Sequence, residues 1–149
     1  MEGLFRYQRF TGDINYWDVS NVTSLKRAFR DNKYFNGDLS SWDVSSVTDM
    51  IETFRGAVFN GDITSWDVSS VTNMYLTFYN NRNFNQNITG WDVSNVSIFN
   101  RTFLYARGFD QDIRAWSVKS NANFSYMFYS ADKMNGAPYL APNTPTSSW

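Results

Sequence analysis

The chain has 149 residues and a net charge of −1, with 42% hydrophobic and 19% aromatic residues and neither cysteine nor histidine. This length suits one domain with a core built largely from rings. Without histidine or cysteine, Ser-His-Asp and Cys-His catalysis and the common zinc sites are excluded. A balanced charge also argues against binding of nucleic acid. We therefore predict a protein that is not an enzyme and that uses no cofactor.

The N-terminal nine residues contain no apolar segment of the kind found in signal peptides. No window of the sequence approaches 18 consecutive apolar residues. We predict neither a secretion signal nor a membrane span within this chain.

One aromatic pattern recurs about every 25 residues along the chain. A phenylalanine opens each unit and a tryptophan follows seven residues later. The phenylalanines are Phe10, Phe35, Phe59, Phe84 and Phe109, and the tryptophans are Trp17, Trp42, Trp66, Trp91 and Trp116. Because a unit of this length cannot bury its apolar side alone, the units must stack on one another. We predict that the tryptophans, with Phe35, Phe59, Phe84 and Phe109, form the structural core.

Within each unit, the residue types predict one strand and one helix. Leu39 to Val44 is apolar, rich in strand-forming residues and bounded by turn residues, which favours a short strand. A hydroxyl-rich stretch then precedes Met74 and Phe78, which are four residues apart, as expected for an N-cap and a short helix. The predicted fold is an α/β repeat, a leucine-rich-repeat-like solenoid of about five 25-residue coils.

The two ends of the chain depart from the repeat. Residues 1–9 are predicted to be an N-terminal cap, and 10–133 a solenoid of five repeats. Residues 134–149 begin a sixth repeat that stops early and continues as a proline-rich tail.

The unit Phe-Asn-Gly-Asp-Leu-Ser-Ser-Trp-Asp-Val-Ser-Ser-Val-Thr-Asp-Met at 35–50 and its four sisters resemble the BspA-type leucine-rich-repeat surface proteins. They are more closely similar to the 25-residue surface-lipoprotein repeat of mycoplasmas and other microbes. This resemblance covers about residues 10 to 136. It implies a non-enzymatic solenoid that is used on surfaces for adhesion or recognition.

Aspartates recur at two positions of the repeat, before and after the tryptophan. They are Asp13, Asp38, Asp62 and Asp112 at the first position, and Asp18, Asp43, Asp67 and Asp92 at the second. Stacked carboxylates repel one another, so something must offset the repulsion. We predict that each accepts backbone N–H groups in a turn, and we predict no metal site, because no spacing matches a known calcium loop. A row of Ca²⁺ sites is the alternative.

A third polar position, Asn36, Asn60, Asn85 and Asp110, follows the opening phenylalanines. We predict that these side chains bond to the backbone of neighbouring coils.

Two surfaces and the tail are candidates for binding a protein or a glycan. On the face of the predicted strand, the candidates are Ser40, Ser41, Thr64, Ser65, Thr89 and Arg114. On the side of the predicted helix they are Tyr75 and Tyr79, amphipathic rings that favour interfaces. Trp149, on the tail, is the last candidate.

We predict a non-enzymatic adhesion module that binds a protein or glycan, located at a cell surface, outside the cell or on a virion. The alternative is a structural subunit of a virion or other extracellular assembly, held by neighbouring subunits through its end coils and tail.

Overall fold

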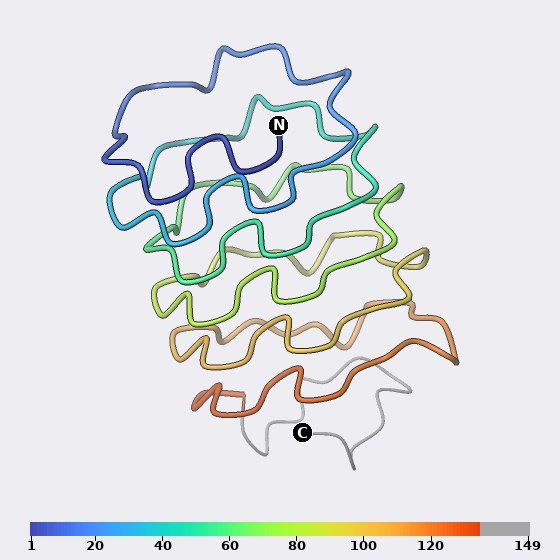
Figure 1. Cartoon of the computed structure of the whole chain (residues 1–149). Helices are drawn as coiled ribbons and strands as arrows, with labels where there is room; N and C mark the ends of the chain where they lie inside the picture. The colour runs from blue at the N-terminus through green and yellow to red at the C-terminus, as the bar shows by residue number, and fades with distance from the viewer. Residues whose placement is uncertain (135–149) are drawn as a thin grey trace.

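The computed structural model describes residues 1–134, and these residues contain no α-helix and no extended strand. The chain winds instead into coils of about 25 residues that stack along one axis (Figure 1). Single parallel bridges mark the same position in successive coils: Ser24 with Asp49, Asp49 with Asn73, Asn73 with Ile98, and Ile98 with Asn123. The predicted tail, including Trp149, lies outside the described residues, and none of the described residues forms a helix that could span a membrane.

The prediction of an α/β leucine-rich-repeat solenoid is wrong, first because the predicted helix does not form. In a helix, the Phe78 N–H would donate to the Met74 carbonyl; here it donates to Thr102 in the next coil, at 2.9 Å. The Thr77 N–H does bond to the Met74 carbonyl, at 3.2 Å, which closes a tight turn. Leu76 is left-handed, with φ of 57°, and such a residue interrupts a right-handed helix.

The same conformation recurs in every coil, in the segments 25–31, 50–56, 74–80, 99–105 and 124–130, which we call the turn segments. In the first four of these segments, N–H groups alternate between a carbonyl three residues back and a carbonyl of the next coil. Two positions of each segment have a positive φ. They are Arg27, Glu52, Leu76, Arg101 and Tyr126, and then Asp31, Gly56, Asn80, Tyr105 and Ser130. The turn segments therefore bond to one another as strands would, but with a folded backbone.

The predicted strand from Leu39 to Val44 is also wrong, because this stretch is a turn. The Trp42 N–H donates to the Leu39 carbonyl at 3.1 Å. Asp38 accepts the Ser40 N–H at 2.8 Å, and this local bond draws the backbone away from an extended path.

The core is a set of aromatic columns along the axis of the stack. Phe54 lies between Phe29 and Phe78, with ring centroids 5.4 and 5.6 Å away. Each buried tryptophan donates its indole N–H to a carbonyl of the preceding coil, as Trp66 does to Leu39 at 2.9 Å. Most of the predicted core residues are at most 4% exposed: Phe35, Phe59, Phe84, Phe109, Trp42, Trp66, Trp91 and Trp116. Trp17, in the first coil, is only partly buried.

Residues 3–7 extend this arrangement by half a coil at the N-terminus. The N–H groups of Gly3, Phe5 and Tyr7 donate to carbonyls of the first turn segment, at 2.8 to 3.2 Å. Phe5 is buried, and its ring lies 5.1 Å from that of Phe29. These residues thus cover the first ring of the phenylalanine column.

Candidate binding surface

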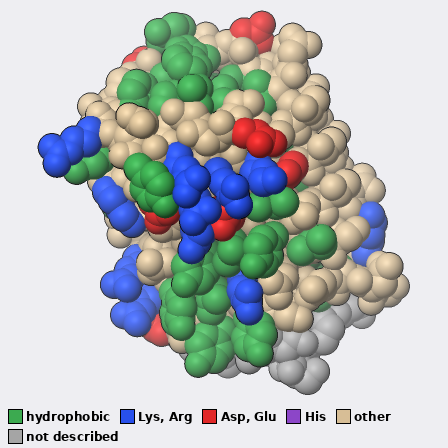
Figure 2. All heavy atoms as spheres, viewed as in Figure 1, with side chains coloured by type: hydrophobic (Ala, Val, Ile, Leu, Met, Phe, Trp, Pro, Cys, Tyr) green, Lys and Arg blue, Asp and Glu red, His purple; other side chains and the backbone are tan. Residues whose placement is uncertain are grey.

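The outward side chains of the turn segments form one surface, which we call the turn face. It is rich in arginine, tyrosine and leucine, and comprises Arg27, Arg30, Glu52, Arg55, Tyr75, Leu76, Tyr79, Arg101, Leu104, Tyr105, Tyr126 and Tyr129. Figure 2 shows basic side chains gathered near the middle of one face of the molecule, beside an area of hydrophobic side chains.

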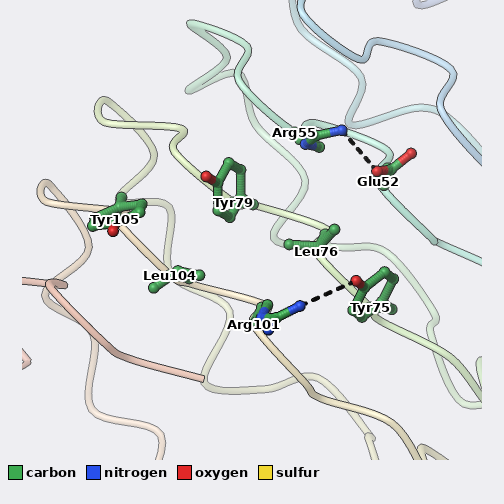
Figure 3. A pocket seen from close by; sticks show the side chains of 8 residues that line it. All are labelled: Glu52, Arg55, Tyr75, Leu76, Tyr79, Arg101, Leu104 and Tyr105. Carbon is green, nitrogen blue, oxygen red and sulfur yellow. Dashed lines mark hydrogen bonds and ion pairs between the residues drawn. The ribbon is translucent and has the colours of Figure 1, made fainter. Parts of the chain in front are cut away.

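A groove of about 480 Å³ lies on the turn face and spans several coils (Figure 3). It is lined by Glu52, Arg55, Tyr75, Leu76, Tyr79, Arg101, Leu104 and Tyr105. Leu76 and Leu104 are each 8% exposed and supply its apolar part. The rings of Tyr79 and Tyr105 meet edge to face, with centroids 5.8 Å apart. The groove therefore combines two leucines and three tyrosines with the charged side chains of Glu52, Arg55 and Arg101.

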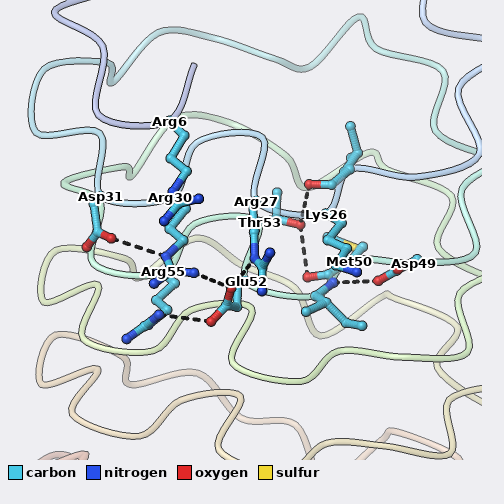
Figure 4. Close-up of polar contacts among 12 residues, drawn as sticks. Arg6, Lys26, Arg27, Arg30, Asp31, Asp49, Met50, Glu52, Thr53 and Arg55 are labelled. Atoms are coloured by element: carbon cyan, nitrogen blue, oxygen red, sulfur yellow. Dashed lines mark hydrogen bonds and ion pairs between the residues drawn. The ribbon is translucent and has the colours of Figure 1, made fainter. Parts of the chain in front are cut away.

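Glu52 gathers three arginines at one end of this groove (Figure 4), a group that we call the arginine cluster. Its carboxylate accepts bonds from Arg27 at 2.6 Å, Arg30 at 2.7 Å and Arg55 at 2.9 Å, although Glu52 itself is only 5% exposed. Burial alone raises the pKa of Glu52, but the hydrogen bond from Arg27 and the charges of Arg30 and Arg55 outweigh it, so its pKa lies below the usual value. Glu52 stays ionised and fixes the three guanidinium groups.

Two arginines also lie over tyrosine rings of the turn face. The Arg55 guanidinium is 5.3 Å from the ring centroid of Tyr79, and that of Arg101 is 5.5 Å from Tyr126. These are cation–π distances. Tyrosine and arginine are enriched in protein interfaces and supply many of their strongest contacts.

The predicted site residues separate into two groups. Tyr75 and Tyr79 line the groove, on the turn face. The others lie together in the turns before the tryptophans, in a different part of each coil. These are Ser40, Ser41, Thr64, Ser65, Thr89 and Arg114.

Polar groups of this second set are used within the protein. The hydroxyls of Ser40 and Thr64 bond to Asp38 and Asp62, that of Thr89 to Asn87, and that of Ser65 to the Ser40 carbonyl. Arg114 pairs with Asp112. These side chains serve the turns in which they lie.

The aspartate positions cap turns. Asp62 accepts the N–H and the hydroxyl of Thr64, and Asp67 accepts the Ser69 N–H. Asn87 makes the same two bonds to Thr89, so an amide oxygen suffices. No group of three or more acidic side chains that could hold a metal ion occurs in residues 1–134. The hydrogen bonds of Asp62 and Asp67 confirm the predicted turn bonding.

The Asn position after each opening phenylalanine also behaves as predicted. Asn60 accepts the Asn85 N–H of the next coil at 2.8 Å, and Asn85 accepts that of Asp110 at 2.8 Å.

We expect stability to fall in acid because hydrogen bonds lower several carboxyl pKa values. Bonds from Ser45 lower that of Asp43, bonds from Thr64 lower that of Asp62, and Arg114 lowers that of Asp112 to about 2. A lowered folded pKa gives stability that is complete above the unfolded pKa and is lost as pH falls through the folded one. The melting temperature should thus hold steady above about pH 5 and drop between about pH 4 and pH 2. Melting curves that are flat down to pH 2 would contradict this expectation.

Sequence reasoning missed most of the turn face, since it assigned this stretch to a helix. A usable signal was present: Arg6, Arg30 and Arg55 recur 24 and 25 residues apart, at one position of the repeat. Equivalent positions of stacked units lie side by side, so this spacing indicates a row of positive charge.

A family model described as "Mycoplasma protein of unknown function, DUF285" matches residues 1–58 and 42–140, two overlapping ranges that cover most of the chain. No curated protein and no solved structure matches the sequence.

Proposed function

This chain belongs to the DUF285 family of Mycoplasma proteins of unknown function, and from this premise we propose that it is a non-enzymatic binding protein that recognises a partner protein through its turn face. We further propose that it acts at a cell surface or outside the cell, where the surface proteins that its repeats resemble are used. The partner would dock on the groove and the arginine cluster together.

The groove is the observation that carries this proposal. Its volume of about 480 Å³ lies in the range of ligand-binding clefts. Tyr79 and Tyr105 offer large, rigid contact areas at little cost in side-chain entropy. Leu76 and Leu104, each 8% exposed, add a small apolar area beside these rings.

The composition of the turn face favours a protein partner over a glycan. Protein interfaces are enriched in tyrosine and arginine, and the groove contains three tyrosines and two arginines. A flat contact with a glycan would use the rows of serine and threonine hydroxyls. Several of these hydroxyls already form hydrogen bonds within the protein.

Binding assays with two matched tyrosine variants test the proposal. Wild-type chain, Tyr79→Ala and Tyr16→Ala would be immobilised and exposed to a panel of purified extracellular-matrix and serum proteins, with a glycan array in parallel. Tyr16 is 78% exposed and lies outside the turn face, which makes it the control. We expect a captured protein to bind wild type and Tyr16→Ala alike, and Tyr79→Ala at least about tenfold more weakly. Capture of glycans alone, or binding that Tyr79→Ala leaves unchanged, would contradict the proposal.

A further inference from the structure

We infer that the turn face takes an acidic, extended polypeptide segment, whose carboxylates bind the arginine cluster while neighbouring apolar side chains lie in the groove. This inference rests on the proposed function and specifies the chemistry of the partner.

The first observation is the charge of the cluster. Arg6, Arg30 and Arg55 occupy one position in successive turns of the stack and lie one below another (Figure 4), with Arg27 beside them. Successive turns bond at strand-like spacing, so the backbones that carry these arginines are about 5 Å apart along the axis of the stack. Glu52 and Asp31 are the carboxylates that pair with them in the described part of the chain. Glu2 adds a third carboxylate, whose charge also acts on Arg27, so the four guanidinium groups of Arg6 and the cluster face three carboxylates and exceed them by one charge.

The second observation is that the guanidinium groups are held in place and still have N–H donors without a carboxylate partner. Arg27, Arg30 and Arg55 together offer about fifteen N–H donors. The structure uses four hydrogen bonds from them to Glu52 and Asp31. The Arg27 side chain is 43% exposed and that of Arg55 is 28% exposed. Because Glu52 already orients these groups, an incoming carboxylate meets several donors at little cost in side-chain entropy.

The third observation is that the cluster and the groove are continuous. Glu52 and Arg55 belong to both, and Leu76 and Leu104 follow them along the stack. A sulfated glycan carries negative charge but no aliphatic side chains to cover these leucines. A polypeptide with carboxylates followed by apolar residues matches both parts.

The length of the segment follows from the spacing of the arginines. Arg101 lines the far end of the groove and forms no ion pair within residues 1–134. It belongs to the turn segment three coils beyond that of Arg30, which corresponds to about 14 Å at strand-like spacing. An extended chain advances about 3.3 Å per residue, so a segment of roughly five to eight residues reaches from the cluster to Arg101.

Fluorescence anisotropy with labelled peptides tests this inference. The probe is the octapeptide Glu-Glu-Glu-Ser-Leu-Ser-Leu-Glu; its comparison peptides replace every glutamate by glutamine or both leucines by serine. A heparin-derived oligosaccharide is the sulfated-glycan arm. The protein variants are Arg27→Gln and, as a charge-matched control, Lys119→Gln, whose Nζ bonds to the Asn95 carbonyl in another part of the coil. Thermal melts of both variants verify that they are folded.

We expect the acidic probe to bind wild type and Lys119→Gln equally, and Arg27→Gln at least fivefold more weakly. The glutamine peptide should lose binding, and the serine peptide should bind several-fold more weakly than the probe. Binding of the oligosaccharide but not of the peptide, or equal binding by Arg27→Gln, would overturn the inference. If a partner from the protein panel needs Tyr79 but the acidic probe fails to bind, the inference is wrong while the proposed function stands. If no partner depends on Tyr79 either, both are wrong.

Discussion

Trp66→Ala is expected to lower the free energy of unfolding by about 3 to 5 kcal/mol. Trp66 is 3% exposed in the central coil, and its ring lies between those of Trp42 and Trp91, with centroids 6.3 and 6.4 Å away. Truncation leaves a cavity in this column. It also removes the buried hydrogen bond from the indole N–H to the Leu39 carbonyl, which then keeps only the Trp42 N–H as a donor.

Urea unfolding followed by circular dichroism measures this loss, with Trp17→Ala as the matched control. Trp17 occupies the same position in the first coil but is only partly buried. Trp17→Ala should therefore lower the free energy of unfolding clearly less than Trp66→Ala does. A loss below about 1 kcal/mol for Trp66→Ala would mean that the tryptophan column does not pack inside the stack.

Glu52→Gln is expected to have the second largest effect, a loss of about 2 to 3 kcal/mol. Removing one member of a buried ion pair costs about 3 to 5 kcal/mol, and the partial exposure of Arg27 and Arg55 reduces this. The glutamine keeps the size of the side chain but loses the charge that holds three guanidinium groups together.

Asp31→Asn is the control for Glu52→Gln. Asp31 also has a positive φ, of 55°, and also pairs with Arg30, but at 3.3 Å and with 28% of its side chain exposed. Asparagine tolerates this backbone conformation, so the variant tests only the loss of a more exposed ion pair. We expect it to lower the free energy of unfolding by less than about 1 kcal/mol. Equal losses for the two variants in urea unfolding would show that Glu52 does not organise the cluster.

The repeat and the burial of its aromatic positions could be predicted from the sequence. Phe35 and Trp42 recur at fixed spacing, and only stacking lets such short units bury them. Likewise, Asp38 and Asp62 each precede a small hydroxyl residue by two positions, which is the spacing of a capped turn. The spacing of the repeat and the hydrogen bonds of these short turns can both be predicted from the sequence.

The backbone of the turn segments could not be predicted in the same way. Met74 and Phe78 are four residues apart, as on the face of a helix, and Leu76 between them gives no sign of a positive φ. The second left-handed position does carry a sign, since Asp31, Gly56 and Asn80 are residue types that adopt this conformation readily. Hydrogen bonds to the next coil determine the backbone conformation of the turn segments. The sequence of a single unit does not show these bonds.

The arginine cluster and the groove depend on this backbone. With a helix at 50–54, the helices of adjacent coils would pack about 8 to 10 Å apart and would not bond to each other through the backbone. The turn segments place the side chains of Glu52 and Arg27 one coil apart, where they bond at 2.6 Å. The arginine cluster and the groove therefore could not be predicted without knowing how the turn segments stack.

Scalar couplings across hydrogen bonds, measured by NMR on the isotope-labelled chain, test the stacked turns most directly. The structure predicts a coupling between the Phe78 amide nitrogen and the Thr102 carbonyl carbon, and another between Phe54 and Thr77. A coupling from the Phe78 nitrogen to the Met74 carbonyl would instead indicate a helix, and would contradict both the fold and the turn face built on it.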